Sequence, residues 1–170
     1  MLIYVDMDGV LSDLDGYLAD YAGVPLQRIK FDREFRAEVV RKSVNSKGLL
    51  HWHGLKPLDR DFWHSKMREW HDAGHRIEIL TSYGSWDPLH VSPMAHMGKT
   101  MWMRTHYGDL FESGVISGFN GVEQCGQKGF FAERGALLVD DQQENCEDFI
   151  CEGGEAILYR TPEDVSGVVP

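Results

Sequence analysis

Short apolar runs along the chain alternate with longer segments in which apolar residues recur every three or four positions. The short runs predict strands at 2–5, 77–80, 115–116, 136–139 and 156–159. The longer segments predict helices at 58–73, 93–107 and 142–151. This alternation is typical of a parallel sheet between two helical layers, so we expect a three-layer, Rossmann-like α/β fold.

Residues 12–56 interrupt the alternation, because they show helical patterns with no strand between them. Tyr17, Leu18 and Tyr21 mark one helical segment of this stretch. We therefore expect a small helical cap at 12–56, inserted after the first strand of a catalytic core formed by 1–11 and 57–170. A peripheral helical decoration of the sheet is the alternative.

The apolar faces of two helices predict which side chains are buried. The expected inward residues are Met94, Met97 and Met101 in 93–107, and Cys146, Phe149 and Ile150 in 142–151.

Three of the expected strands end in polar residues. These residues are Asp6 and Asp8 after the first strand, Thr81 and Ser82 after the second, and Asp140 and Asp141 after the fourth. Ligands of open α/β sheets bind outside the carboxyl ends of the strands, so we expect these side chains to meet in one site.

The predicted site combines metal ligands with groups that bind an anion. Crowded carboxylates repel one another unless a cation lies between them, and oxygen ligands suit Mg²⁺. The expected magnesium ligands are Asp6, Asp8, Asp140 and Asp141. The expected phosphate-binding groups are the hydroxyls of Thr81 and Ser82, the ammonium group of Lys128 and the backbone N–H of Gly9.

The stretch VDMDGVLSDLDG resembles the first motif of the haloacid dehalogenase superfamily. Thr81 resembles its second motif, and Lys128 followed by LLVDD resembles its third and fourth. A closer resemblance, through DMDGVLSDLDG, LKPLDRDF, ILTSYG and LLVDD, is to the 5'(3')-deoxyribonucleotidases. It implies a haloacid dehalogenase-like core with a helical cap between the first two motifs. Leu14 stands where that family tends to place an aromatic residue of the base pocket.

The resemblance also implies a role for each site residue. Asp6 is the nucleophile that forms an aspartyl-phosphate, and Asp8 is the general acid and base. Asp6, the backbone carbonyl of Asp8, and Asp141 hold Mg²⁺, whereas Asp140 acts through water or Lys128.

The implied activity is hydrolysis of a small phosphorylated substrate, with a nucleoside monophosphate as the preferred class. The aromatic residues that could stack on a base are Phe31, Phe35, Trp52 and Trp86, and we expect Trp52 and Leu14 to contact the substrate. Three alternatives remain: a phosphatase for nucleic-acid ends, a phosphatase for another small metabolite, and a non-catalytic module that binds Mg²⁺ or phosphate.

Composition narrows the choice of partners. The formal charge of −10 argues against binding a long nucleic acid.

Three cysteines without a CxxC pair predict a reducing, cytoplasmic setting. We expect neither a signal peptide nor a membrane anchor, because no basic leader or long apolar run is present. The oligomeric state stays open, with a homodimer as one option.

Overall fold

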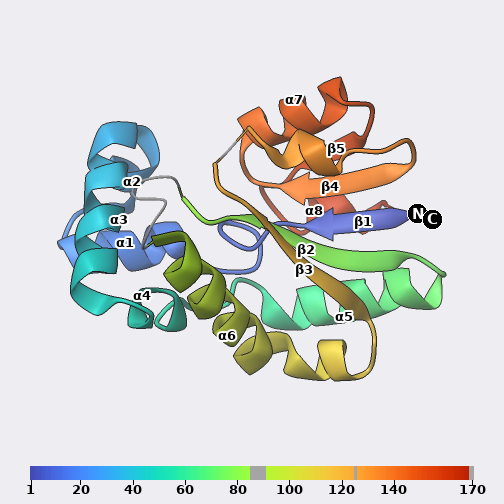
Figure 1. The fold of residues 1–170 in the computed structure, drawn as a ribbon, viewed down its shortest axis with the longest axis horizontal. Helices are drawn as coiled ribbons and strands as arrows, with labels where there is room; N and C mark the ends of the chain where they lie inside the picture. The colour runs from blue at the N-terminus through green and yellow to red at the C-terminus, as the bar shows by residue number, and fades with distance from the viewer. Residues whose placement is uncertain (85–90, 125, 169–170) are drawn as a thin grey trace.

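The computed structural model describes residues 1–84, 91–124 and 126–168, which form a five-stranded sheet with flanking helices (Figure 1). All neighbouring strands are parallel, in the order β3-β2-β1-β4-β5. The strands are β1 (Leu2–Val5), β2 (Arg76–Ser82), β3 (Ile116–Val122), β4 (Ala136–Asp140) and β5 (Glu155–Leu158). This is the expected Rossmann-like α/β architecture.

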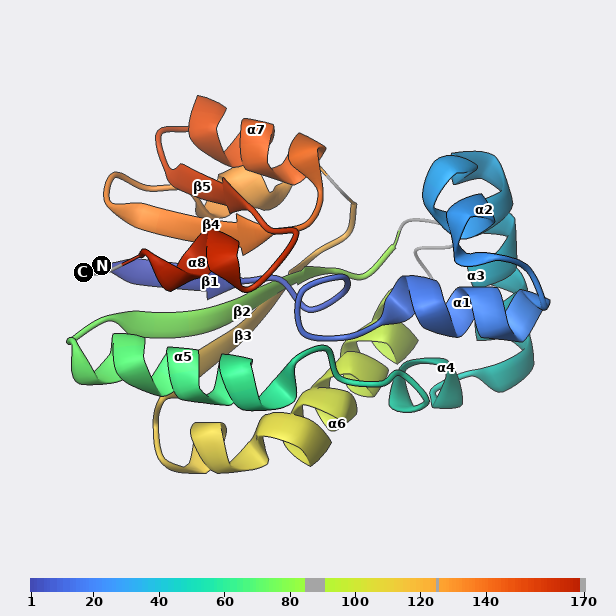
Figure 2. The same ribbon diagram turned by 180° about the vertical axis from the view of Figure 1, so that it is seen from behind.

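Helices cover both faces of the sheet, and a further group lies beyond its end (Figures 1 and 2). The group beyond the end comprises α1 (Leu14–Ala22), α2 (Leu26–Phe31), α3 (Arg33–Lys47) and α4 (Leu50–His53). The others are α5 (Arg60–Asp72), α6 (Val91–Glu112), the 3₁₀ helix η1 (Lys128–Phe131), α7 (Gln143–Cys151) and α8 (Glu163–Ser166). No helix among the described residues is long and apolar enough to cross a membrane.

The sheet is buried on both faces, which explains why its strands are almost continuously apolar. Successive side chains of β1 point to opposite faces. Ile3 and Val5 belong to the core that includes Trp63 of α5, whereas Leu2 and Tyr4 pack in a second cluster with Phe149 of α7. The sheet therefore forms the middle of three layers.

β3 is longer than the two residues that the sequence predicts. It pairs with β2 as far as Val122, although it contains two glycines, which are depleted in strands. A Cβ atom at Gly118 would press on the Glu78 side chain of β2, and Asn120 donates a 2.7 Å hydrogen bond to the same carboxylate. Side chains from β2 thus fill space that the β3 sequence leaves empty.

The predicted inward faces of two helices need correction. Met97 and Met101 of α6 are 53% and 48% exposed, so the prediction that they face inward is wrong, whereas Met94 is partly buried and packs against the core. The buried positions of α6 include Ala95, Lys99 and Trp102, which follow an i, i+4, i+7 spacing.

In α7, Cys146 and Phe149 are buried as predicted, but Ile150 is exposed. Ile150 follows Phe149 directly, and adjacent helical positions lie about 100° apart around the axis, so both cannot face the sheet.

The cap expected at 12–56 corresponds to α1–α4, and one continuous hydrophobic cluster joins these helices to the sheet. Its attachment to α6 is close. A Cβ atom at Gly98 would lie 2.7 Å from a ring carbon of Trp52 in α4, so only glycine allows α6 this close to the indole. Trp102 of α6 also donates a 2.8 Å hydrogen bond to the Leu55 carbonyl. Treating this segment as a separate cap domain remains a prediction.

The packing of Trp52 predicts how strongly its substitution lowers the stability of the protein. Trp52→Ala should lower the free energy of unfolding by about 3–5 kcal/mol, because it leaves a cavity beneath α6. Leu50→Ala, on the exposed side of the same helix, should change it by less than about 0.5 kcal/mol. Urea denaturation of the two variants measures the difference, and equal losses would contradict the assigned packing.

Candidate active site

The polar residues predicted to meet do lie at one edge of the sheet, because β1 is flanked by β2 and β4. Asp6 follows β1 directly, and its backbone N–H donates a 2.9 Å hydrogen bond to the Val139 carbonyl of β4. Thr81 lies in β2, and Asp140 ends β4. All three of these side chains are buried.

The turn after β1 holds Asp8 and brings Asp141 close. Ser12 Oγ donates a 3.0 Å hydrogen bond to Asp8 Oδ1. Gly9 has a φ of +84°, and a Cβ atom there would collide with the Asp141 carboxylate. The Gly9 N–H donates to the Ser12 carbonyl at 2.8 Å. Gly9 thus makes room for Asp141, and its N–H is engaged by the turn itself, contrary to the predicted anion contact.

Lys128 connects two of the carboxylates. Its Nζ lies 2.7 Å from Asp6 Oδ1 and 2.5 Å from Asp140 Oδ2, and the side chain is fully buried. The 3₁₀ helix that carries Lys128 is held to α7 by a 2.5 Å hydrogen bond from Gly129 N–H to Asp148 Oδ2. Ion pairing to both aspartates raises the pKa of Lys128 despite its burial, so the ammonium group stays charged.

A second buried lysine, Lys99 of α6, reaches the site from the opposite side. Its Nζ donates to Asp8 Oδ2 at 2.6 Å, to Thr81 Oγ1 at 2.8 Å and to the Ser82 carbonyl at 2.6 Å. These contacts use all three ammonium protons, and the residue is only 2% exposed. Lys99 therefore fixes the Asp8 carboxylate against the end of β2.

The sequence reasoning missed Lys99, although a signal was present. Lys99 falls on the face of α6 that also carries Ala95 and Trp102. A lysine on a buried helical face needs a charged partner, because an unpaired buried charge is costly. The spacing of Met94, Met97 and Met101 instead predicted a different buried face for this helix.

The carboxylates differ in their electrostatic environment. Burial raises the pKa of Asp6 to about 7, although Lys128 opposes the shift. Burial, reinforced by the charges of Asp6 and Asp140, raises the pKa of Asp141 to about 8. Asp8 behaves in the opposite way: burial would raise its pKa, but Lys99 outweighs burial and lowers it. Negative charge is therefore under-compensated at Asp6 and Asp141.

These residues fit a magnesium ion. Within the described ranges, one group of potential metal ligands stands out: Asp6, Asp140 and Asp141 bring carboxylate oxygens within 4.8 Å of one another. Asp141 Oδ1 is buried and finds no hydrogen-bond partner in the described part of the chain. Such an oxygen is costly unless a cation or water binds it. An all-oxygen set of this kind matches the preference of Mg²⁺.

Asp140 is less available as a ligand than Asp6 and Asp141. Its oxygens accept hydrogen bonds from Lys128, from the Gln142 N–H at 2.7 Å and from Asn145 Nδ2 at 3.0 and 3.1 Å. These donors hold Asp140 in place, so its main effect is to orient Lys128 and the start of α7.

The hydroxyl groups of Thr81 and Ser82 in β2 differ in their hydrogen bonding. Thr81 Oγ1 accepts from Lys99, which leaves its own proton free to donate. Ser82 Oγ is buried without a hydrogen-bond partner among the residues that the structure describes. Both hydroxyls therefore keep a proton that they can donate to a ligand.

The structure does not support the predicted contacts of Leu14 and Trp52 with a substrate. Both side chains belong to the buried core, and Trp52 is only 3% exposed, so its ring offers no open face to a base. Phe35 packs under the Arg28 guanidinium, 3.9 Å from its ring centroid. Phe31 is exposed, and Trp86 lies outside the described residues. The stacking prediction for Trp52 is therefore corrected to a packing role.

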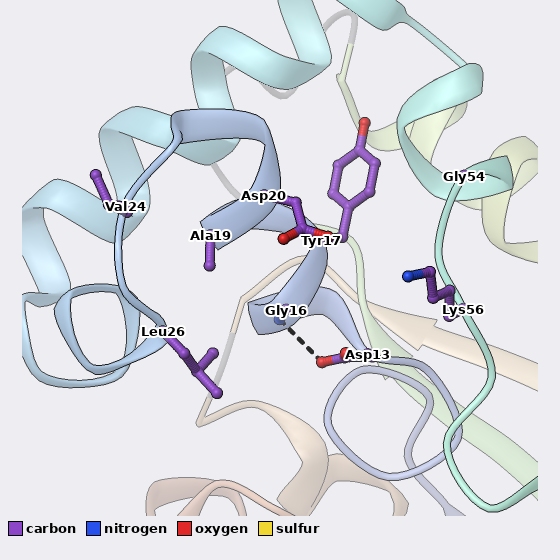
Figure 3. A pocket seen from close by; sticks show the side chains of 9 residues that line it. All are labelled: Asp13, Gly16, Tyr17, Ala19, Asp20, Val24, Leu26, Gly54 and Lys56. Carbon is purple, nitrogen blue, oxygen red and sulfur yellow. Dashed lines mark hydrogen bonds between the residues drawn. The ribbon is translucent and has the colours of Figure 1, made fainter.

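A cavity of about 330 Å³ lies beside α1 (Figure 3). Its lining includes Asp13, Asp20, Tyr17 and Lys56, but none of the four clustered aspartates at the strand ends. The Asp13 carboxylate in this wall accepts a 2.9 Å hydrogen bond from the Gly16 N–H and caps α1. The cavity is thus distinct from the carboxylate site.

Comparison with known proteins finds related folds but no related sequence. No model of a known protein family matches the chain, and no curated protein matches it either. A HAD-superfamily hydrolase, subfamily IA, variant 1, from Geobacter sulfurreducens PCA is 14% identical, with a TM-score of 0.54 over 95% of this chain and 90% of that chain. The D,D-heptose 1,7-bisphosphate phosphatase from Burkholderia thailandensis is 13% identical, with a TM-score of 0.49 over 99% and 86%. The first of these likenesses establishes that this chain has the HAD-type α/β fold.

Proposed function

We propose that this protein is a magnesium-dependent phosphomonoesterase in which Asp6 is the nucleophile. One observation carries the proposal: two buried lysines form ion pairs with two carboxylates that follow the same strand. Lys128 pairs with Asp6, and Lys99 pairs with Asp8. A module that only bound a metal ion would not need two carboxylates in such different environments. The HAD-superfamily hydrolase with the same fold supports hydrolysis as the type of reaction.

The proposed reaction has two steps, and Asp8 serves both. Asp8 is an anion in the free site, and a dianionic phosphate bound beside it favours its protonation. An Asp6 oxygen then attacks phosphorus, and the bond from phosphorus to the alcohol oxygen breaks while the protonated Asp8 gives its proton to that oxygen. Water then attacks the aspartyl-phosphate. Asp8 takes a proton from this water, and Asp6 leaves as a carboxylate. Asp8 returns the proton to solvent as the phosphate departs, so the enzyme is restored.

The other site residues hold the phosphoryl group. The Thr81 and Ser82 hydroxyls and the Lys128 ammonium offset charge on its equatorial oxygens. Asp6 and Asp141 would hold Mg²⁺, together with the Asp8 carbonyl. When bound, the ion supplies positive charge that lets an anionic nucleophile approach an anionic phosphate.

We propose a nucleoside monophosphate as the substrate class and a cytoplasmic location. The support is the motif resemblance to 5'(3')-deoxyribonucleotidases and the exposed ring of Phe31 in α2. The burial of Trp52 removes one of the aromatic residues first assigned to the base. A screen of purified protein with Mg²⁺ against nucleoside monophosphates, sugar phosphates and phosphorylated oligonucleotides tests this assignment.

Asp6→Asn should abolish phosphate release. The change removes the attacking charge, so kcat for 4-nitrophenyl phosphate should fall by roughly 10³-fold or more. Asp13→Asn is a matched control, because it makes the same chemical change in the same loop and keeps a good helix cap. Near-normal turnover by Asp6→Asn would refute covalent catalysis at this residue.

Magnesium should stabilise the protein more at pH 8 than at pH 5.5. Because folding raises the pKa of Asp6 to about 7 and of Asp141 to about 8, the folded state binds more protons than the unfolded state from about pH 4 upward. Stability without metal should therefore fall as the pH rises through this window. Mg²⁺ needs the deprotonated carboxylates, so it should restore the loss.

Thermal unfolding in EDTA and in excess Mg²⁺, at both pH values, measures this effect. Asp141→Asn should shrink the Mg²⁺-induced rise in Tm at pH 8. A rise of equal size at both pH values would contradict the carboxylate site.

Lys99→Met should impair catalysis while keeping the length of the buried side chain. Losing a charged hydrogen bond costs about 1.5–3 kcal/mol, so kcat/KM should fall by about 10- to 150-fold. Lys66→Met provides a control, because Lys66 is also a buried lysine but pairs with Glu69 on α5. Comparable losses of kcat/KM in both variants would show that Lys99 matters only for folding.

A further inference from the structure

The first turn of α3 places two arginines between the helices that follow the catalytic loops. Arg36 Nε donates a 2.8 Å hydrogen bond to Asp15 in the first turn of α1. Arg33 Nη2 lies 3.4 Å from Glu144 in the first turn of α7. α1 follows the turn that bears Asp8, and α7 follows Asp141. The two arginines therefore link the cap helix α3 to the starts of α1 and α7.

Helix stability does not explain this placement. Positive side chains in the first turn of a helix oppose its dipole. Arg33 is 87% exposed at the side chain, and such surface pairs contribute little to stability. The Arg33–Glu144 contact can therefore be given up easily in exchange for another anion.

Arg36 contacts the first turn of the helix that follows the Asp8 turn, and its guanidinium has hydrogen-bond donors that this contact does not use. Burial would lower its pKa, but the charges of Asp15, Asp8 and Asp141 raise it, so the guanidinium stays charged close to the site. Only its Nε forms a hydrogen bond within the described ranges. The terminal nitrogens form the planar fork that suits a carboxylate or a phosphate.

The two lysines of the site cannot serve this purpose. Lys128 is occupied by Asp6 and Asp140, and Lys99 by Asp8, Thr81 and the Ser82 carbonyl. Both are buried, so a second anionic group on the substrate needs a different cation.

We propose that Arg36, assisted by Arg33, binds a second anionic group on the leaving group of the substrate, either a carboxylate or a phosphate. This inference rests on the proposed phosphatase function, and it favours substrates with a second anionic group over the simple nucleoside monophosphates proposed above. Nucleotides with a second phosphate and small phosphorylated acids share this chemistry.

Two pairs of substrates distinguish a second phosphate from a carboxylate as the group that Arg36 binds. One pair is thymidine 5'-monophosphate and thymidine 3',5'-bisphosphate; the other is glycerol 2-phosphate and glycerate 2-phosphate, which differ by a carboxylate. The wild-type protein should show the higher kcat/KM for the doubly anionic member of at least one pair. Arg36→Ala should reduce that preference by about 10-fold or more, and Arg36→Lys should reduce it less.

Arg41→Ala is the matched control, because Arg41 is an exposed arginine on the same helix, and it should leave the preference unchanged. Calorimetric titration of the same pairs into Asp6→Asn gives a readout that does not need turnover. If Arg36→Ala slows both members of each pair equally, Arg36 only anchors the cap and the inference fails. Hydrolysis of 4-nitrophenyl phosphate without any preference within the pairs would overturn this inference alone, whereas absent hydrolysis would overturn the phosphatase itself.

Discussion

The ion pairs of two buried lysines are the interactions on which the site depends. Lys128 joins Asp6 to Asp140, and Lys99 joins Asp8 to Thr81. Without these ammonium groups, carboxylates gathered at the end of a buried sheet would repel one another or take up protons. With them, Asp8 is held as an anion, while Asp6 and Asp141 keep the raised pKa values that mark a place for a cation.

The position of Lys99 depends in turn on how the cap packs. Gly98 lets α6 lie directly against the ring of Trp52, and the next residue is the lysine that reaches Asp8. The Trp102 hydrogen bond to the Leu55 carbonyl fixes the same contact one turn later. Apolar packing between α4 and α6 therefore fixes the position of a charged group beside the carboxylates.

Much of the fold could be predicted, because the strands of a sheet that is buried on both faces are continuous runs of apolar residues. The strands at 2–5 and 136–139 are runs of apolar residues, and the structure contains both. β3 was largely hidden, because its glycines are supported by Glu78 and Tyr83 of the neighbouring segment rather than by its own side chains. The inward face of α6 was misjudged because methionines, which suit both core and surface, outnumbered the small residues that make the contact.

The sequence by itself determined which chemical groups follow each strand, because a parallel sheet brings the carboxyl ends of its strands to one edge. Asp6, Asp8, Thr81, Asp140 and Asp141 could be named on that ground, and Lys128 by the motif resemblance. Only the tertiary structure decided how these charges pair, that Lys99 joins them and that Arg33 and Arg36 pair with Glu144 and Asp15. The reason is physical: strand ends follow from local pattern, whereas ion pairs between α3, α6 and the sheet depend on distances set by packing across the whole chain.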